Sequence, residues 1–197
     1  MDEQRSTRWF SERSQEERRD YARRFVDIAA AGHDVDGEAR LIDAMARPGS
    51  AVLDAGCGAG RIAHALSLRG HRVIGVDADP LLIEAGHEQH PDVDLRVLDL
   101  VDLTPEVGTF DLIVCTGNVM TFAEPGTEPA ILAAMATVLA PSGRVVFGFH
   151  LDRTYTLEAL DQQATEIGWT LEHRFGTWDL EPFTDDSDWA VSVFRSC

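Results

Sequence analysis

Apolar and polar positions alternate along this chain in two periods, one typical of helices and the other of buried strands. Residues 14–31 are amphipathic, and their apolar side chains, Tyr21 among them, fall on one helical stripe. A second short helix is predicted over residues 36–46. These two helices are expected to form an N-terminal extension, residues 1–48, that packs on the rest of the chain.

From residue 51 onward, short apolar runs alternate with amphipathic segments. The apolar runs predict strands over residues 51–55, 72–77, 93–98, 110–115, 144–149, 170–175 and 189–194. The amphipathic segments predict helices over residues 61–70, 80–88, 127–139 and 156–167, the third closed by a turn at 141–143. Such alternation predicts an α/β fold, with a mostly parallel sheet between two layers of helices. The last two strands have no helix between them, so one strand at the end is expected to be antiparallel.

Composition narrows the class of partner. The chain has 197 residues, and its 34 acidic side chains outnumber its 17 basic ones, giving a formal net charge of −17. Such acidity disfavours nucleic acid as a partner, because affinity for DNA or RNA depends largely on neutralising phosphates. No apolar run is long enough to span a bilayer, and no signal peptide or cysteine-rich metal pattern is present. We therefore expect a single-domain cytoplasmic protein, either a monomer or a homodimer.

The sharpest motif is the glycine-rich segment VLDAGCGAGR at residues 52–61, between a predicted strand and a predicted helix. Glycines allow a tight turn there and let a ligand approach the backbone. Asp77 ends the next strand, 17 residues beyond Gly60, where a carboxylate can bind both hydroxyls of a ribose. A nucleoside-containing cofactor is therefore predicted.

The loop distinguishes two classes of cofactor. A dinucleotide needs the pattern GxGxxG, but the third position after Gly58 is Arg61. Asp54, at the mouth of the loop, would repel a pyrophosphate and would suit a cation. S-adenosylmethionine has no phosphate and carries both an amino group and a sulfonium, so the loop favours it over a nicotinamide dinucleotide.

These motifs resemble those of the class I S-adenosylmethionine-dependent methyltransferases. VLDAGCGAG matches the first motif of that family, and GVDADP, RVLDL and FDLIVCTGN are similar to the next three in order and spacing. The resemblance covers roughly residues 50–150, and it implies a Rossmann-like sheet of seven strands with an antiparallel last strand. The cofactor-binding core would then span 49–150, with the C-terminal helix and the last two strands in 151–197.

The resemblance also implies roles for individual residues. Asp77 would hold the ribose, Asp99 would lie near the adenine amino group, and Leu100 would lie along the adenine ring. Tyr21, on an N-terminal helix, either covers the cofactor as a lid or packs in the core. The whole predicted cofactor site is Asp54, Ala55, Gly56, Cys57, Gly58, Gly60, Arg61, Asp77, Ala78, Asp99, Leu100, Thr116 and Tyr21.

The methyl acceptor is expected beyond the fourth and fifth strands, where ligands of open parallel sheets bind. His150 is the candidate general base, because its pKa lies near working pH; it is otherwise a strand-end histidine bonded to a neighbouring loop. Asn118 either orients the acceptor or forms a turn. The chain lacks the Asn/Asp-Pro-Pro-Tyr/Phe tetrapeptide of family members that methylate amino groups of bases, so a small-molecule acceptor is predicted. An acidic aromatic segment at 178–183 is a second candidate wall of the acceptor pocket.

Two other functions fit the same layout. One is a binding module that retains the cofactor without catalysis, and the other is a nicotinamide-dependent oxidoreductase. No metal site is predicted. His87 and His90 have metal-like spacing, but they lie at the end of a helix, where a histidine interacts favourably with the helix dipole.

Overall fold

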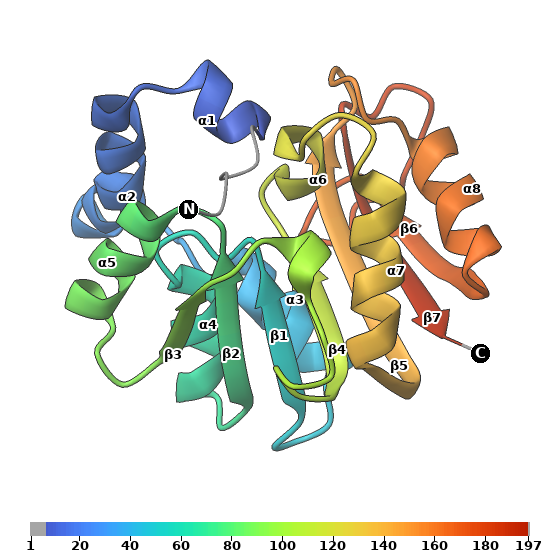
Figure 1. Ribbon diagram of the computed structural model, residues 1–197, viewed down its shortest axis with the longest axis horizontal. Coiled ribbons are helices and arrows are strands. Elements are labelled where there is room, and N and C mark those ends of the chain that lie inside the picture. Colours follow the sequence, from blue (N-terminus) through green and yellow to red (C-terminus); the bar gives the residue numbers. More distant parts are fainter. Residues whose placement is uncertain (1–6, 197) are drawn as a thin grey trace.

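The computed structural model describes residues 7–196 and contains one seven-stranded sheet between two layers of helices (Figure 1). Its strands are β1 (Ala51–Ala55), β2 (Arg72–Asp77), β3 (Asp94–Val97), β4 (Phe110–Cys115), β5 (Leu139–His150), β6 (Trp169–Phe175) and β7 (Trp189–Ser196). Their order in the sheet is β3-β2-β1-β4-β5-β7-β6. Only β7 runs antiparallel to its neighbours, which confirms the predicted α/β, Rossmann-like sheet.

The described chain also contains eight α-helices and one 3-10 turn. They are α1 (Arg8–Glu12), α2 (Gln15–Ala30), α3 (Gly37–Met45), α4 (Arg61–Leu68), α5 (Pro80–Gln89), η1 (Leu100–Asp102), α6 (Val119–Phe122), α7 (Glu128–Val138) and α8 (Leu157–Glu166). Three were not predicted: α1, η1 and α6, each of five residues or fewer. Elements this short complete hardly more than one turn, so they leave no helical period in the sequence.

The strand predictions were correct in number, and one boundary was wrong. The turn predicted at 141–143 lies within β5, which begins at Leu139 rather than at residue 144. Leu139 pairs with Phe110, but the next pair is Leu112 with Arg144, so the residues between form a bulge. Ser142 lies there at a φ of 59°, which shows that the predicted bend exists without ending the pairing.

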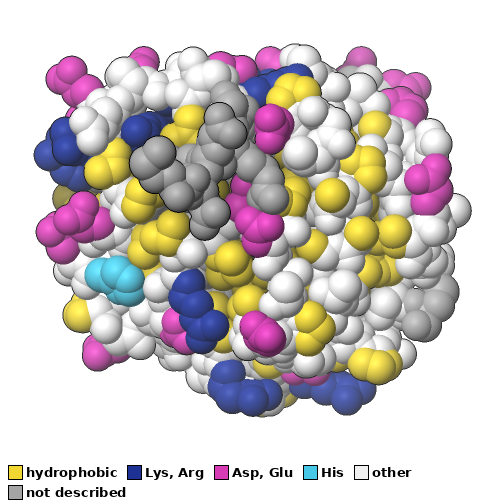
Figure 2. Space-filling model, viewed as in Figure 1, with side chains coloured by type: hydrophobic (Ala, Val, Ile, Leu, Met, Phe, Trp, Pro, Cys, Tyr) yellow, Lys and Arg dark blue, Asp and Glu magenta, His cyan; other side chains and the backbone are white. Residues whose placement is uncertain are grey.

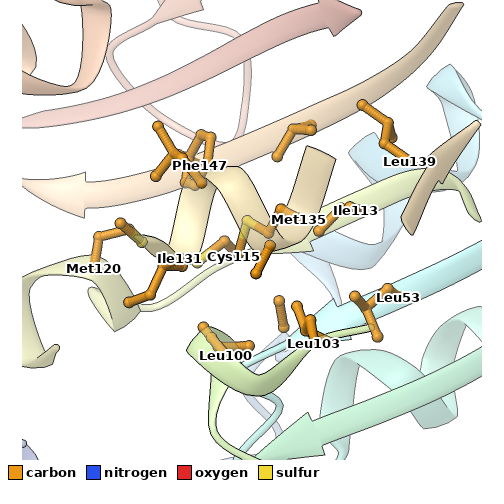
Figure 3. Packing of buried hydrophobic residues seen from close by; sticks show 14 of the residues in the cluster. Leu53, Leu100, Leu103, Ile113, Cys115, Met120, Ile131, Met135, Leu139 and Phe147 are labelled. Atoms are coloured by element: carbon orange, nitrogen blue, oxygen red, sulfur yellow. The ribbon is translucent and has the colours of Figure 1, made fainter. Parts of the chain in front are cut away.

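Each face of the sheet is covered by a different set of helices. Helices α7 and α8 cover one face, and α3 and α4 cover the other (Figure 1). On the first face, Ile131 and Met135 of α7 point toward Ile113, Cys115 and Phe147 of β4 and β5 (Figure 3). This fully buried layer fixes β4 and β5 beside each other and therefore sets where the loops at their carboxyl ends lie.

Helices α1 and α2 lie over the carboxyl edge of the sheet, whereas α3, predicted as part of the same extension, packs on one face. Ser14 begins α2 with a capping box: its hydroxyl accepts from the backbone N–H of Glu17, whose carboxylate accepts from the Ser14 N–H at 2.7 Å. Helix α2 then packs beside α5, and α1 packs beside α6. The extension predicted from the sequence thus reaches the edge where parallel sheets bind ligands.

Candidate functional site

A pocket opens at the carboxyl ends of β1, β2 and β4, beneath α1 and α2. It encloses about 1220 Å³, including the part open to solvent, which is ample for a cofactor and a small acceptor. Figure 2, seen from the same side as Figure 1, shows hydrophobic side chains over the middle of the molecule, with acidic side chains both among them and along the edge. Of the predicted cofactor residues, ten line the pocket: Tyr21, Gly56, Cys57, Gly58, Arg61, Asp77, Ala78, Asp99, Leu100 and Thr116.

The three glycines of the loop are required for two different reasons. All have positive φ, at 77° for Gly56, 56° for Gly58 and 79° for Gly60. A Cβ on Gly58 would meet only Tyr21, at 3.9 Å, so it would project into the open pocket. A Cβ on Gly56 would lie 2.5 Å from Val119, and one on Gly60 would lie 2.7 Å from Leu95. Gly58 therefore shapes the cradle for a ligand, whereas Gly56 and Gly60 allow close packing.

Asp77 is held in place by the backbone of the loop it faces. Its carboxylate accepts hydrogen bonds from the N–H groups of Gly58 and Asp79, both at 2.9 Å. Burial raises the pKa of Asp77 to about 6, opposed by these two hydrogen bonds. Each oxygen accepts one of these bonds and keeps a further lone pair, so the carboxylate can accept from a pair of hydroxyls.

Asp54 lies beneath the glycine loop rather than at its mouth. It is 1% exposed, and its Oδ2 accepts from the N–H of Ala63, at 3.0 Å, near the start of α4. Its Oδ1 is buried and has no partner in the described structure. Burial raises the pKa of Asp54 to about 7, so a nearby cation would favour its charged form. Asp54 and its neighbour Ala55 therefore support the pocket from behind, as neither lines it.

Arg61 is paired with a carboxylate that the sequence analysis did not identify. Its guanidinium donates to both oxygens of Glu38 in α3, at 2.8 and 3.0 Å, and to the carbonyl of Val35. The same group lies over the Phe25 ring, 4.3 Å from its centroid. Both charged side chains line the pocket, and their bidentate pairing fixes α3 against α4.

Cys57 is an inert filler in the loop. Burial, and to a lesser extent the charge of Asp54, raise the pKa of its thiol.

The helices above the pocket are anchored by a fully buried carboxylate. Asp79 caps α5, as predicted, by accepting from the N–H of Leu81 at 3.0 Å. The same side chain accepts from Trp9 Nε1 at 2.7 Å and from the guanidinium of Arg18 at 2.9 Å. Trp9 and Tyr21 line the pocket with rings 5.0 Å apart, and burial raises the pKa of Tyr21. Asp79 thus joins α1 and α2 to the edge of the sheet.

Asn118 and His150, the predicted catalytic pair, lie together but are not among the described residues that line the pocket. The side-chain oxygen of Asn118 accepts from the backbone N–H of His150 at 2.8 Å. Asn118 has a φ of 71°, a left-handed conformation that asparagine tolerates. The imidazole of His150 packs edge-on against Trp189, with ring centroids 4.6 Å apart. The pair joins the carboxyl ends of β4 and β5.

Sequence reasoning missed a large part of the pocket wall. The missed residues come mainly from α1, α2 and α6, namely Thr7, Trp9, Phe10, Ala22, Phe25, Val119, Phe122 and Ala123. The adjacent aromatic residues Trp9 and Phe10, just before the predicted helix of residues 14–31, were the available signal. The segment 178–183 does not line the pocket in the described structure: Trp178 packs over Gly148, where a Cβ would be 2.3 Å from its ring.

Comparisons with known proteins identify the family. A sequence profile described as "Methyltransferase domain" matches residues 52–143. The chain is 41% identical to a solved TehB-like SAM-dependent methyltransferase from Corynebacterium glutamicum, with a TM-score of 0.88 over 93% of this chain and 100% of that one. This chain belongs to the class I S-adenosylmethionine-dependent methyltransferases. Its cofactor is S-adenosylmethionine, and the nicotinamide alternative is wrong.

Relatives whose names state an acceptor are similar to this chain over a smaller share of its length. It is 32% identical to the ubiquinone biosynthesis O-methyltransferase of Xanthomonas campestris, over 70% of this chain and 63% of that protein. It is 28% identical to the 18S rRNA (guanine-N(7))-methyltransferase of Bos taurus, over 60% of this chain and 46% of that one. The chain spans less than two thirds of either relative, and the two act on different acceptors.

Two residues that line the pocket and one that lies behind it fit S-adenosylmethionine. Gly58 leaves open space where any side chain would project, and Asp77 presents a carboxylate beside it. The unpartnered Oδ1 of Asp54 is a buried acceptor close to the loop, as a cationic ligand requires.

No helix among the described residues is long and apolar enough to cross a membrane.

Proposed function

We propose that this methyltransferase transfers a methyl group from S-adenosylmethionine to a small-molecule acceptor. The observation that carries the proposal is the continuity of one pocket: the residues of the cofactor loop and the aromatic side chains Trp9, Tyr21 and Phe122 line the same space. Helices α1, α2 and α6 cover this space and leave a pocket large enough for the cofactor together with a small acceptor. The formal charge of −17 further disfavours a polyanionic acceptor.

Bound S-adenosylmethionine supplies an activated methyl group on a sulfonium, so the protein contributes mainly by holding the acceptor in line. Asp77 would hold the ribose hydroxyls, and Asp99, Leu100 and Ala78 would hold the adenine side. Asp54 would act from behind the loop, where its charge favours the cationic end of the cofactor. Tyr21 would cover the bound cofactor and, with Trp9, exclude water.

The remaining site residues have proposed supporting roles. Ala55, Gly56 and Gly60 would shape the loop, Cys57 would fill the space behind it, and Thr116 would border the methionine end of the cofactor. Through its ion pair with Glu38, Arg61 would keep α3 packed against α4.

The catalytic roles of Asn118 and His150 stay predictions. Asn118 fixes the backbone between β4 and β5, which supports a positioning role for it. To act as a general base, His150 would have to turn its imidazole from Trp189 toward the pocket. We also propose a cytoplasmic, single-domain protein that acts as a monomer or homodimer.

The proposed function is tested by titrating the protein with S-adenosylhomocysteine in a calorimeter and then supplying radiolabelled S-adenosylmethionine with a panel of small acceptors. We expect micromolar binding and transfer of label to at least one low-molecular-weight acceptor. Absence of binding would refute the cofactor assignment. Binding with label transferred only to RNA would instead refute the small-molecule acceptor.

Cofactor affinity is expected to fall as the pH is lowered from 7 to 5. The pKa of Asp77 is raised to about 6, mainly by burial, so the free protein carries a proton there at pH 5. Ribose hydroxyls donate to the ionised carboxylate, and the protonated form of Asp77 must therefore lose its proton before the cofactor binds. This requirement lowers the affinity about tenfold between pH 7 and pH 5. Titrations with S-adenosylhomocysteine at both values should show this change. Asp77→Asn should remove about tenfold of the change and leave the part that Asp54 contributes, because the pKa of Asp54 is raised to about 7. An unchanged slope in that variant would assign the whole titration to another group.

A further inference from the structure

A second hollow lies at the amino edge of the sheet, opposite the cofactor pocket. It is bordered by the chain between α3 and β1, the start of β4, the bulge of β5 and the end of the antiparallel strand β7 (Figure 1). It encloses about 970 Å³, including the part open to solvent. None of the described residues that line it also lines the cofactor pocket, so the two spaces are separate.

Positive charge gathers at this hollow in an otherwise acidic protein. Arg47, Arg144 and Arg195 line it, which is three of the 17 basic side chains of the chain. Of the acidic side chains within residues 7–196, Asp111 alone lines it. Figure 2 shows basic side chains at the bottom of the molecule, where Figure 1 places the amino ends of the parallel strands. A concave surface with one sign of charge attracts ligands of the opposite sign, so this hollow favours an anion.

Two of these arginines are held in place by one carboxylate. Glu172 of β6 accepts from Nε of Arg144 at 2.7 Å through one oxygen and from Nε of Arg195 through the other. Arg195 also donates through Nη1 to the carbonyl of Ser142 at 2.9 Å. Among residues 7–196, the Nη2 of neither arginine has an acceptor. Each guanidinium is therefore fixed in position and keeps N–H donors for a further oxygen.

The other charged groups leave the hollow positive. Arg47 is exposed, and in the described part of the chain its guanidinium has no ion pair or hydrogen bond. Arg72 lies beside it, since its Nε donates to the carbonyl of Gly49 at 3.4 Å. The Asp111 carboxylate accepts from a backbone N–H at the start of β1, at 2.8 Å. Four arginines and two carboxylates thus surround the hollow, which leaves two positive charges in excess.

We propose that this hollow binds the dianionic phosphate group of a small molecule. The oxygens of a phosphate point in several directions, so they can accept from guanidinium groups that come from separate segments of the chain. The two negative charges of the group also match the excess of positive charge. A carboxylate is planar and carries one charge, so it would satisfy fewer of these donors.

Two properties of the protein narrow the source of the phosphate group. The hollow is larger than a bare phosphate ion needs, and it therefore has room for an organic remainder. A nucleic acid is disfavoured, because its other phosphates would meet a chain with a formal charge of −17. The site is separate from the cofactor pocket, so the proposal does not rest on the proposed function.

The test compares three anions by calorimetric titration at pH 8 and constant ionic strength. The anions are glycerol 3-phosphate, inorganic phosphate and acetate. We expect glycerol 3-phosphate to bind at least about tenfold more tightly than acetate, with inorganic phosphate between them. Tighter binding of inorganic phosphate than of glycerol 3-phosphate would overturn the assignment to an organic phosphate and give the site to the free ion.

Two variants with matched controls locate the site. Arg47→Gln should weaken the binding of glycerol 3-phosphate by about tenfold without a change in stability, because its guanidinium has no partner within residues 7–196. Its control, Arg19→Gln, removes another exposed arginine and should bind as the parent does. Arg195→Gln should weaken binding similarly, with Arg174→Gln as its control. Each of these two removes an arginine from an ion pair, but Arg174 does not line the hollow.

Four results would contradict the proposal. They are no binding of either phosphate at millimolar concentration, binding of acetate as tight as that of the phosphates, equal affinities in Arg47→Gln and Arg19→Gln, and competition between glycerol 3-phosphate and S-adenosylhomocysteine. Such competition would place the anion in the cofactor pocket. Tighter binding of a short RNA oligonucleotide than of glycerol 3-phosphate would overturn the small-molecule assignment in favour of nucleic acid. If Arg195→Gln does not fold, Arg47→Gln alone decides the question.

Discussion

Asp77→Ala is expected to weaken the binding of S-adenosylhomocysteine by about a hundredfold or more. The carboxylate lines the pocket next to Gly58 and is proposed to accept from both ribose hydroxyls. Hydrogen bonds to a charged group contribute roughly 1.5–3 kcal/mol each, so the loss of two corresponds to at least this factor. Calorimetric titration of the variant and the parent protein measures the change directly.

The variant should remain folded, because it removes a carboxylate whose raised pKa shows that burial of its charge is unfavourable. Asp94→Ala is the matched control: it removes a half-exposed carboxylate of β3, which pairs with Arg96 and lies outside the pocket. We expect that control to bind S-adenosylhomocysteine as the parent does. Equal affinity in Asp77→Ala would remove the ribose assignment and, with it, the main support for the cofactor orientation.

Asp79→Ala is expected to lower the free energy of unfolding by about 3 kcal/mol, because it breaks a buried ion pair and leaves its partner without a counter-charge. Asp79 is 0% exposed, and its loss would leave Trp9 Nε1, the Arg18 guanidinium and the Leu81 N–H without their acceptor. For a chain of this length the change corresponds to a Tm lower by roughly 6–12 °C, which thermal unfolding measures. The same loss should free α1 and α2 and weaken cofactor binding, although Asp79 does not line the pocket.

An exposed ion pair of α2 supplies the control for this prediction. Asp20→Ala removes a carboxylate that pairs with Arg23, with both side chains more than half exposed, and should change stability by less than about 1 kcal/mol. Hydrogen exchange in Asp79→Ala should rise first in α1 and α2 and not in the central strands. An unchanged Tm, or exchange that rises equally throughout the sheet, would show that Asp79 does not anchor these helices.

The sequence alone determined the sheet and the cofactor side of the pocket. Strands β1 and β2, the loop between β1 and α4, and the strand-end Asp77 lie within 27 consecutive residues, 51–77. Their relative positions follow from short-range rules: parallel strands place their carboxyl ends together, and glycine is the residue that adopts the positive φ at Gly58 without strain. The local pattern was therefore enough to identify the fold and the class of cofactor.

Only the tertiary structure decided the opposite wall of the pocket. Helices α1 and α6 are too short to leave a period, and the bond from Trp9 to Asp79 joins residues 70 positions apart. The sequence did not show side-chain directions, so Arg61 was predicted as a cofactor-site residue, and its ion pair with Glu38 became visible only in the packing of α3 on α4. Contacts of this kind depend on how elements pack after they form, and no local propensity encodes them. The glycine loop thus identified the class of cofactor, and the packing of remote helices determined the aromatic wall that faces it.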